Sequence, residues 1–389
     1  MGNMENHIRK ICVVTWFNSL NYGTCIQCYA LTKYLSNQGY IIFVPESYRY
    51  YYGLRHPYET CLRILSKIKQ MANPPNAAKN ENLNDSFIRE GYVVRKKKNT
   101  QFAYSYNNIY KISSRRDYIN LIKGCDVFIT GSDQIWNPGY VTPPYLLSFT
   151  NNSQKKIAYG SSIGVDYIPE KLKKQYKKYL SRFNKIGVRE LTAQRELEQL
   201  LDKEVWNVLD PSFLLTKNEW KEITLGEVKK SLINEKFIFC YFIGKNTGWM
   251  TDVRAFAEKN QLKVYCALSE SNIVPEYGIP LADIGVQEFI EYLLYASCVI
   301  TDSFHAAALS INFNKPFAVY KRFEDNENGS QNSRILDLLE KFCLERCLVS
   351  GNVHDLNFLL NTFDYTRVNK ILEQDRIESK RFLKEAIEE

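Results

Sequence analysis

Short apolar runs alternate with helical patterns along most of this 389-residue chain, and this alternation limits the fold more than any other feature. The run at 10–16 is almost continuously apolar, as in a strand that is buried on both faces. A polar loop, a helical pattern at 24–37 and a second apolar run at 40–44 follow it. A strand, a helix and a strand in this order are typical of a parallel, doubly wound sheet.

The same alternation starts again in the second half of the chain. An apolar run at 236–242 predicts a strand, and another at 296–301 leads through a short polar turn into an alanine-rich helical pattern at 304–313. The stretch that separates the two series, 215–235, is charged and has no strong strand pattern. The sequence therefore predicts an α/β protein of two Rossmann-like, doubly wound domains that face each other across a cleft, a preferred place for small-molecule sites.

Chain length also favours two domains, because single hydrophobic cores rarely grow beyond about 250 to 300 residues. We place the N-terminal domain at 1–214, with a helical insertion at about 50–110 that contains asparagine-rich patches and a proline pair. The interdomain connection is placed at 215–235 and the C-terminal domain at 236–365. The last residues, 366–389, show the charged pattern of an amphipathic helix.

The formal net charge is +8, from 51 basic and 43 acidic residues, and the excess is local. Basic runs occur at 95–98 and 171–178, without the interleaved aromatic residues of a nucleic-acid-binding motif. Such runs form either the solvated face of a helix or a surface that attracts an anionic membrane or a lipid-linked anionic substrate. Nucleic acid is therefore not an expected partner, and a peripheral membrane contact stays open.

No targeting or membrane-spanning segment is expected, which favours a cytoplasmic protein. The first ten residues are mostly polar, and the apolar run after them is far too short for a signal peptide or a transmembrane helix. In that compartment most of the ten cysteines are expected to pack as small, reduced core residues. Cys25 and Cys28 are spaced as a redox or metal pair, but no matching second pair accompanies them. Core packing is favoured, and no metal site is predicted.

Four polar loops follow predicted strands. They lie at 18–24, at 131–138, at Arg189-Glu190 and at 301–305. The carboxyl ends of parallel strands lie at the same edge of a sheet, which is where such sheets bind ligands. We therefore expect these loops to form one candidate site.

The first of these loops, with Asn21, Tyr22 and Gly23, comes directly before a helical pattern. A glycine there lets backbone amides approach a ligand, and the start of a helix favours an anion. The alternative is an ordinary turn in which Thr24 caps the helix. The loop contains neither of the common glycine-rich nucleotide fingerprints.

Asp133 is the candidate acid–base residue of the second loop. Its carboxylate can accept a proton from a sugar hydroxyl, with Trp136 as a platform and Gln134 and Asn137 beside it. An aspartate in a polar turn also serves simply to form the turn, so both interpretations stay open.

Arg189 and His305 complete the candidate set. Arg189 ends an apolar strand pattern, where an arginine suits bidentate binding of a carboxylate or phosphate or, alternatively, a surface salt bridge. His305 is one of four histidines and lies at a predicted helix start after Thr301-Asp302-Ser303. Histidine donates or accepts a proton near neutral pH, although a single histidine is more often structural.

Taken together, these loops resemble the polysaccharide pyruvyl transferase family. The similarity covers about residues 10 to 345, and five segments in one order are more specific than any of them alone. The matching segments are Asn21-Tyr22-Gly23-Thr24 with Gln27, the loop from Gly131 to Asn137, Val188-Arg189-Glu190, Asp210-Pro211-Ser212, and Thr301 to His305.

The resemblance implies a glycosyltransferase-B-like architecture with the site between the two halves. It also implies a transferase that moves pyruvate from phosphoenolpyruvate onto two hydroxyls of a sugar, with a cyclic ketal and phosphate as products. The acceptor would be a bacterial-type surface polysaccharide, such as an exopolysaccharide or capsule, or its lipid-linked precursor. Phosphoenolpyruvate is then a co-substrate, and no cofactor is expected. The C-terminal domain is the expected donor side and the N-terminal domain the acceptor side.

Roles for individual residues follow from this resemblance and from the chemistry. Forming a ketal from an enol phosphate requires a proton donor, cations for the carboxylate and phosphate, and a base toward the acceptor. We expect His305 to be the general acid or a phosphate ligand and Asp133 to be the base. The expected donor-binding residues are Arg189, Ser303, Phe304 and Lys321, and the expected acceptor or loop residues are Asn21, Tyr22, Gly23, Gln134, Trp136 and Asn137.

The chain departs from the family pattern at one position. Family members often carry Arg-Leu-His where this chain has Ser303-Phe304-His305, so the arginine is missing. Lys315, Lys321 and Arg322 lie downstream and are alternative sources of the second positive charge. Two other functions stay open: a sugar-nucleotide-dependent glycosyltransferase of the same architecture, and a non-catalytic scaffold of a membrane glycan-assembly complex.

Overall fold

The computed structural model describes most of the chain, and the expected insertion at about 50–110 lies partly outside it. The part of that insertion that is described holds a long helix, α4 (Leu83–Tyr106), and a short strand, β3 (Ile109–Tyr110). The described residues are 8–48, 50–51, 83–232, 234–244, 248–269, 274–324, 330–349, 355–361 and 363–389.

Within these ranges the first half of the chain forms a parallel sheet of seven strands in the order β3-β2-β1-β4-β5-β6-β7. The central strand β1 pairs through Ile11 with Ile42 on one side and with Val127 on the other. The strand order reverses between β1 and β4, and this is the switch point at which open α/β sheets bind ligands. Besides β3, the strands of this sheet are β1 (Lys10–Val14), β2 (Ile41–Pro45), β4 (Val127–Thr130), β5 (Lys155–Ser161), β6 (Lys185–Val188) and β7 (Trp206–Asn207).

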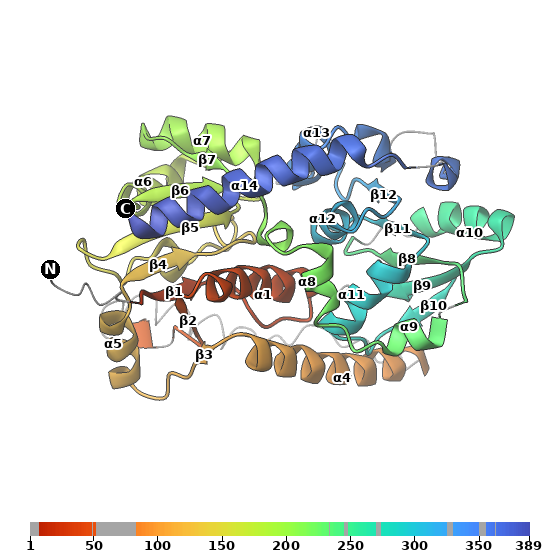
Figure 1. The fold of residues 1–389 in the computed structure, drawn as a ribbon, viewed down its shortest axis with the longest axis horizontal. Helices are drawn as coiled ribbons and strands as arrows, with labels where there is room; N and C mark the ends of the chain where they lie inside the picture. Colours follow the sequence, from red (N-terminus) through yellow and green to blue (C-terminus); the bar gives the residue numbers. More distant parts are fainter. Residues whose placement is uncertain are drawn as a thin grey trace, which may run out of the picture.

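The second half repeats this winding in a parallel sheet that has six strands among the described residues, in the order β10-β9-β8-β11-β12-β13. Its switch point lies between β8 and β11 (Figure 1). The expected pair of doubly wound α/β domains is therefore confirmed. The strands are β8 (Phe237–Tyr241), β9 (Lys263–Ala267), β10 (Ile279–Leu281), β11 (Cys298–Thr301), β12 (Phe317–Tyr320) and β13 (Leu348–Val349).

Helices cover both faces of each sheet, so the central strands are buried and their apolar runs are continuous. The stretch expected to connect the domains holds two short helices, α8 (Lys217–Lys221) and α9 (Glu227–Leu232). The longer helices are α1 (Tyr22–Asn37), α5 (Arg115–Gly124), α6 (Glu170–Leu180), α7 (Leu191–Leu201), α10 (Trp249–Asn260), α11 (Val286–Tyr295), α12 (Phe304–Asn312), α13 (Ser333–Lys341) and α14 (Thr366–Glu388), with 3₁₀ turns at Pro143–Leu146, Pro211–Phe213, Glu345–Cys347 and Asn357–Leu360.

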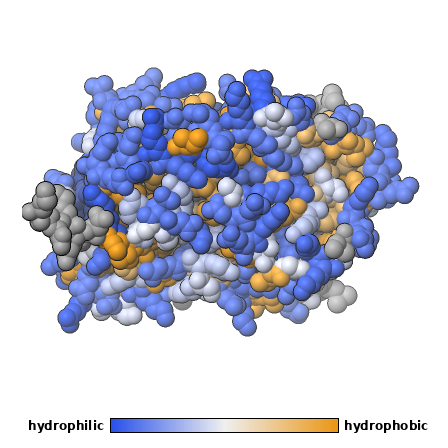
Figure 2. Space-filling model, viewed as in Figure 1, coloured by the Kyte–Doolittle hydropathy of each residue, from blue (hydrophilic) through white to orange (hydrophobic). Residues whose placement is uncertain are grey.

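Helix α14 runs from the second domain back onto the first (Figure 1). Its Arg376 Nε donates to the carbonyl of Phe213 at 2.7 Å, and its Ser379 Oγ accepts the backbone N–H of Leu209 at 2.9 Å. Near its end, the carbonyl of Ile387 accepts from Lys155 Nζ at 3.0 Å. The terminal amphipathic helix therefore joins the two halves instead of standing apart from them. Hydrophilic side chains cover most of this face of the molecule, with apolar residues in smaller groups (Figure 2).

Helix α1 begins earlier than the sequence predicts. Asn21 is its N-cap, and the Asn21 side chain accepts the N–H of Gly23 at 2.9 Å, so Thr24 lies inside the first turn and is not the cap. Tyr22 stacks on Phe289 of α11 at 4.2 Å, and its hydroxyl donates to the carbonyl of Ile284 at 3.2 Å. The start of α1 therefore forms part of the contact between the domains.

Candidate functional site

The loops that follow β4, β6 and β7 meet the start of α12 in one buried network. Thr24 Oγ1 donates to Asp133 Oδ2 at 3.0 Å, and Asp133 Oδ1 lies 3.9 Å from Arg189 Nη2. Arg189 Nη1 donates to Asp210 Oδ2 at 2.8 Å, and this oxygen lies 3.7 Å from His305 Nε2. The structure thus brings residues from all four expected loops together, with His305 as the contribution of the second domain.

Arg189 is the centre of this network. Its side chain is only 1% exposed, so the surface salt bridge considered above does not describe it. Its Nε donates to Glu190 Oε1 at 2.9 Å, and its guanidinium lies 4.4 Å above the centre of the Phe304 ring. Burial lowers the pKa of Arg189, but Glu190, Asp210 and Asp133 outweigh it and raise the pKa above its usual value. Nη2 is buried and has no hydrogen-bond partner among the described residues, so this nitrogen can bind a ligand.

Asp210 was not among the expected site residues, although Asp210-Pro211-Ser212 is one of the segments that resemble the family. Its side chain is fully buried and accepts from Ser132 Oγ at 2.8 Å and from the N–H of Ser212 at 2.9 Å. Burial raises the pKa of Asp210, but His305 and Arg189 outweigh burial and hold that pKa well below its usual range. The signal was available, because Asp210 follows a strand pattern just as Arg189 does.

His305 occupies the first turn of α12 and is 7% exposed. Its ring packs on Gly23, where a Cβ atom would lie only 2.1 Å from Nδ1. The glycine therefore makes room for the imidazole, and since its N–H is bound to Asn21, it does not offer that amide to a ligand. Nε2 is buried and has no hydrogen-bond partner in the part of the chain that the structure describes, and Asp210 Oδ2 lies 3.7 Å from it. The other three histidines, His7, His56 and His354, lie outside the described residues.

Two further arginines adjoin this network from the second domain. Arg322 follows β12 and donates to Asp302 from Nε, at 3.1 Å, and from Nη2 to the Asp302 carbonyl, at 3.0 Å. Asp302 also accepts the N–H groups of Ile243 and Gly244, both at 2.7 Å, so this carboxylate fixes the position of Arg322. Of the three cations proposed from the sequence, Lys315 precedes β12 and binds the carbonyl of Ala296 at 2.8 Å, at the opposite end of the sheet.

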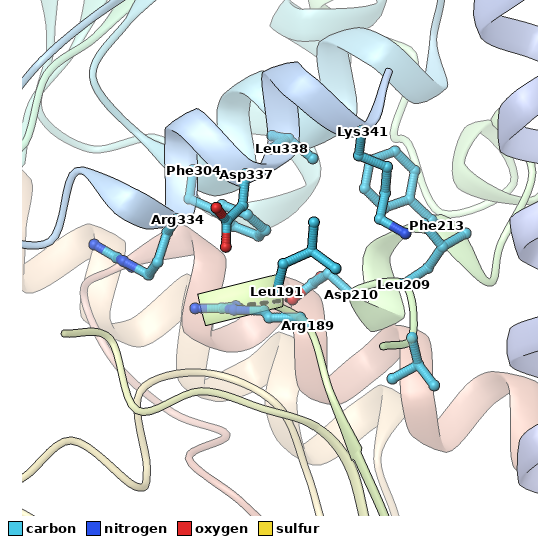
Figure 3. A pocket seen from close by; sticks show the side chains of 11 residues that line it. Arg189, Leu191, Leu209, Asp210, Phe213, Phe304, Arg334, Asp337, Leu338 and Lys341 are labelled. Carbon is cyan, nitrogen blue, oxygen red and sulfur yellow. Dashed lines mark hydrogen bonds and ion pairs between the residues drawn. The ribbon is translucent and has the colours of Figure 1, made fainter. Parts of the chain in front are cut away.

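Arg334 was missed by the sequence analysis because it lies in a helix, α13, and not after a strand. It is buried, and Nη2 donates to Gln331 Oε1 at 2.9 Å. Within the described ranges no carboxylate forms an ion pair with it; nearby Asp337 accepts instead from the N–H and hydroxyl of Thr192, at 3.1 and 3.2 Å. Burial and, after it, the charges of Arg189 and Arg322 lower the pKa of Arg334 to about 9. Figure 3 shows the guanidinium groups of Arg189 and Arg334 turned to the same side of a narrow crevice.

Asp133 combines both interpretations that its position allowed. Its Oδ1 accepts the N–H of Gln134 at 2.9 Å, which is turn chemistry, while its carboxylate also faces Arg189. Its φ of +74° lies in the left-handed region, which is costly for a residue with a side chain. Backbone strain of this kind concentrates at functional sites.

The rest of the second loop is mostly buried. Trp136 is 0% exposed, and its Nε1 donates to the carbonyl of Tyr145 at 2.9 Å, so its ring is not available as the expected platform. Asn137 Oδ1 accepts the N–H of Gly139 at 2.9 Å and shapes the loop. The Gln134 amide is best satisfied with its oxygen 2.8 Å from Arg334 Nη1, across the gap between the domains.

The remaining expected residues have varied surroundings. Tyr22 is fully buried between the domains, which excludes direct contact with an acceptor in this conformation. Ser303 is the N-cap of α12, and its Oγ accepts the N–H of Ala306 at 3.5 Å. Phe304 forms the apolar floor under Arg189. Lys321 is partly exposed directly after β12.

A separate cavity of about 610 Å³ opens at the carboxyl ends of β1 and β2. It borders the network at Thr24, whose hydroxyl binds Asp133. The sequence analysis did not identify it, because its walls come from loops, from α4 and from the 3₁₀ turn at 143–146. They include Trp16, Phe17, Asn18, Asn21, Glu46, Tyr48, Tyr104 and Tyr145.

The described residues contain neither a metal-binding cluster nor a membrane-spanning helix. No group of three or more His, Cys, Asp or Glu side chains is placed to hold a metal ion there. Cys25 and Cys28 are free and buried on α1, and burial raises the pKa of Cys25 to about 12. None of the described helices combines the length and apolar character needed to span a membrane.

Solved structures with the same fold have very different sequences. A UDP-N-acetylglucosamine 2-epimerase is similar over 97% of this chain and 95% of its own, with 12% identity and a TM-score of 0.52. The UDP-GlcNAc 2-epimerase of Neisseria meningitidis bound to UDP-GlcNAc covers 96% and 100%, with 11% identity and a TM-score of 0.49. Arabidopsis thaliana UGT89C1 complexed with quercetin covers 97% and 94%, with 13% identity and a TM-score of 0.43. At 12% identity the first of these likenesses concerns the fold alone, a glycosyltransferase-B-like pair of Rossmann-type domains.

The family comparison is more specific. No curated protein matches the chain. The family model described as polysaccharide pyruvyl transferase matches residues 21–322, more than half of the chain. This range contains Asp133, Arg189, Asp210 and His305 and ends at Arg322. The chain therefore belongs to the polysaccharide pyruvyl transferase family.

Proposed function

We propose that this chain transfers the pyruvyl group of phosphoenolpyruvate to two hydroxyls of a sugar and forms a cyclic ketal. The acceptor is a bacterial-type surface polysaccharide or its lipid-linked precursor. Family membership supports the reaction class. The observation that carries the proposal is that Arg189 and His305 share Asp210 Oδ2 and that each keeps a buried nitrogen, Nη2 and Nε2, without a hydrogen-bond partner among the described residues.

The donor is an anion with a carboxylate and a phosphate, and a buried anion must be paired with cations. Arg189 offers Nη2, and Arg322 and Arg334 lie close enough for their charges to influence one another. The first amides of α12 add donors that precede the first intrahelical bond. In this proposal Ser303 fixes that helix start, Phe304 holds Arg189 flat, and Lys321 approaches the donor from the end of β12.

The reaction forms two carbon–oxygen bonds at the enol carbon of the donor, the first by addition across the double bond and the second by displacement of phosphate. A proton adds to the methylene carbon while the first sugar hydroxyl bonds to the adjacent carbon and loses its own proton. The second hydroxyl then bonds to the same carbon as the carbon–oxygen bond to phosphate breaks, and its proton leaves with phosphate. The products are the ketal and inorganic phosphate, and no oxidant is needed.

In this proposal His305 delivers the first proton, which is supported by its Nε2, buried without a hydrogen-bond partner among the described residues, and by the packing of its ring on Gly23. Asp210 lies 3.7 Å away and offsets positive charge on the imidazole during proton transfer. Asp133 is the proposed base for the sugar hydroxyl, positioned by Thr24 and Gln134. The buried cations stabilise the charge that gathers on the departing phosphate.

The test is a purified-protein assay with phosphoenolpyruvate and a panel of acceptor glycans. Phosphate release that depends on an acceptor, with gain of a pyruvyl ketal on the glycan by mass spectrometry, is the expected result. His305→Gln and Arg189→Lys should each lower turnover by roughly 10²-fold or more, while the exposed control Arg254→Gln on α10 should not. Near-normal turnover by His305→Gln would remove its assigned role.

The same assay separates the two alternatives. A glycosyltransferase of this fold would release a nucleoside diphosphate from a sugar nucleotide and ignore phosphoenolpyruvate. A non-catalytic scaffold would show no heat of phosphoenolpyruvate binding in calorimetry. Either result, obtained with folded protein, would contradict the proposed function.

We also place the enzyme in the cytoplasm, at the inner face of the membrane where a lipid-linked acceptor is assembled. The exposed lysines of α6, at 171, 174, 177 and 178, support contact with an anionic surface. Co-sedimentation with vesicles that contain anionic lipid, lost at high salt, is the expected observation.

A further inference from the structure

The cavity of about 610 Å³ beside the network has the composition of a carbohydrate site. Its rings, Trp16, Tyr48 and Tyr145 among them, offer flat apolar faces with polar edges. Hydroxyl and amide groups from the loop after β1 line the same cavity. Pockets of this size with a few oriented polar groups on apolar walls are typical of small-molecule sites.

The aromatic wall is ordered by its own contacts. The Trp16 ring lies 5.6 Å from Tyr140 and meets Tyr145 edge-on at 6.0 Å. The Tyr145 carbonyl binds Nε1 of Trp136 behind it. Trp136 thus supports the wall from within, and Trp16, which is partly exposed, is the ring that can stack on a sugar.

A single carboxylate, Glu46, stands in the cavity among the described residues that line it. Its backbone N–H is fixed by the carbonyl of Tyr110 at 3.1 Å. Its Oε1 accepts from the hydroxyl of Tyr104 at 2.7 Å, and this hydrogen bond is the main reason that the pKa of Tyr104 rises to about 12. An oriented carboxylate of this kind accepts hydrogen bonds from sugar hydroxyls and repels a sugar that carries its own carboxylate or phosphate.

The cavity and the arginine-rich centre share one wall. Thr24 lines the cavity and donates to Asp133, which faces Arg189. A sugar in contact with Thr24 would therefore be separated from the proposed base by that one side chain. The two sides differ in charge, with Arg189, Arg322 and Arg334 on one side and Glu46 on the other.

From this placement we propose that the cavity binds an uncharged sugar residue of the acceptor, with Trp16 stacked on the ring and Glu46 bound to its hydroxyls. This inference rests on the proposed function, because it names the acceptor class of the same site. Glu46 then excludes uronic acids and phosphorylated sugars from the position next to the donor. Selectivity arises from repulsion by this carboxylate as well as from attraction to the rings.

The experiment is saturation-transfer NMR on the full chain with two probes, methyl β-D-glucopyranoside and methyl β-D-glucuronide, together with calorimetry of phosphoenolpyruvate binding. The neutral glycoside should bind, and the glucuronide should bind at least about tenfold more weakly. Trp16→Ala should weaken the neutral glycoside by about tenfold or more, while the exposed control Tyr167→Ala leaves it unchanged. Glu46→Gln should bring the glucuronide close to the neutral glycoside, and the exposed control Glu258→Gln should not.

The outcomes separate this inference from the proposed function. If the wild-type protein does not bind phosphoenolpyruvate, the proposed function itself is contradicted. With donor binding intact, equal binding of both glycosides, binding that ignores Trp16→Ala, or no glycoside binding would each overturn the inference. Tyr104→Phe keeps the ring and removes only the hydroxyl that orients Glu46, so it should weaken the neutral glycoside by a smaller factor, about two- to fivefold. Unchanged donor binding in each variant shows that the chain is folded.

Discussion

Replacing Gly23 by alanine sets two physical effects of opposite sign against each other. In the first turn of a helix, alanine in place of glycine stabilises a protein by about 0.4 to 1 kcal/mol, chiefly by restricting the unfolded chain. The new Cβ, however, would lie 2.1 Å from His305 Nδ1, 2.6 Å from Cγ and 2.9 Å from Cε1. Ordinary contacts of a Cβ begin at about 3.4 Å, so the imidazole must move by more than about 1 Å.

The steric cost is expected to exceed the gain from helix propensity. Overpacking a buried site costs about 1 to 3 kcal/mol, which exceeds the helix gain, so Gly23→Ala should lower the free energy of unfolding by about 1 to 2 kcal/mol. A displacement of about 1 Å at a reacting group costs on the order of 10²-fold in rate. Turnover should therefore fall far more than stability does.

The measurement is a double-mutant cycle by chemical denaturation, with turnover recorded for each variant that keeps His305. In a His305→Ala background the clash is gone, and Gly23→Ala should become neutral or stabilising. Gly124→Ala at the end of α5 is the matched control, since no heavy atom lies within 4 Å of its added Cβ. A Gly23→Ala protein with wild-type stability and turnover, or with the same effect in both backgrounds, would refute the packing of His305 described above.

Three further predictions concern the charges of the site. Arg334→Gln should raise the free energy of unfolding by about 1 to 3 kcal/mol, because it removes a buried cation that has no ion-pair partner among the described residues. The same variant should bind phosphoenolpyruvate about tenfold more weakly, or weaker still, in calorimetry. Since the folded-state pKa of Arg334 is lowered to about 9, the stability gain should be constant below that pH and shrink above it, and a pH-independent gain would contradict this cause. Asp210→Asn should lower the free energy of unfolding by about 3 kcal/mol at pH 7. The folded pKa of Asp210 lies below its unfolded value, so this difference should shrink as the pH falls below about 4, and the denaturation curves of wild type and variant should converge there. His305→Gln should lower turnover by about 10²- to 10⁴-fold while donor affinity changes only severalfold, and a large loss of affinity with normal turnover would make His305 a ligand and not the acid.

The sequence predicts the central parts of the fold well because burial on both faces leaves a continuous apolar signal. The strands expected at 236–242 and 296–301 and the helix expected at 304–313 agree with β8, β11 and α12 to within two residues at each end. The edge strands β3, β10 and β13 were missed. Each has only two or three residues and is partly exposed, so it carries no pattern that sequence alone can detect.

The candidate site was predictable only where it follows strands. The rule that parallel strands end at one edge of a sheet placed Asp133 and Arg189 together and applies equally to Asp210, and the expected facing of the two domains brought His305 to them. Burial of individual side chains did not follow from that rule. Trp136 belongs to the loop that the rule selected and is fully buried, while partly exposed Trp16, one loop earlier, faces the cavity.

We propose that Arg334 takes the place of the arginine that the family often carries before its histidine, and the distribution of charge supports this. Arg189 is surrounded by Glu190, Asp210 and Asp133, so its positive charge is already matched before any ligand arrives. Arg322 is matched by Asp302. Arg334 is different, because no carboxylate forms an ion pair with it in the described part of the chain, and burial and then the neighbouring arginines lower its pKa. A buried cation in that situation costs stability unless an anion joins it, so α13 supplies the surplus charge that the start of α12 does not.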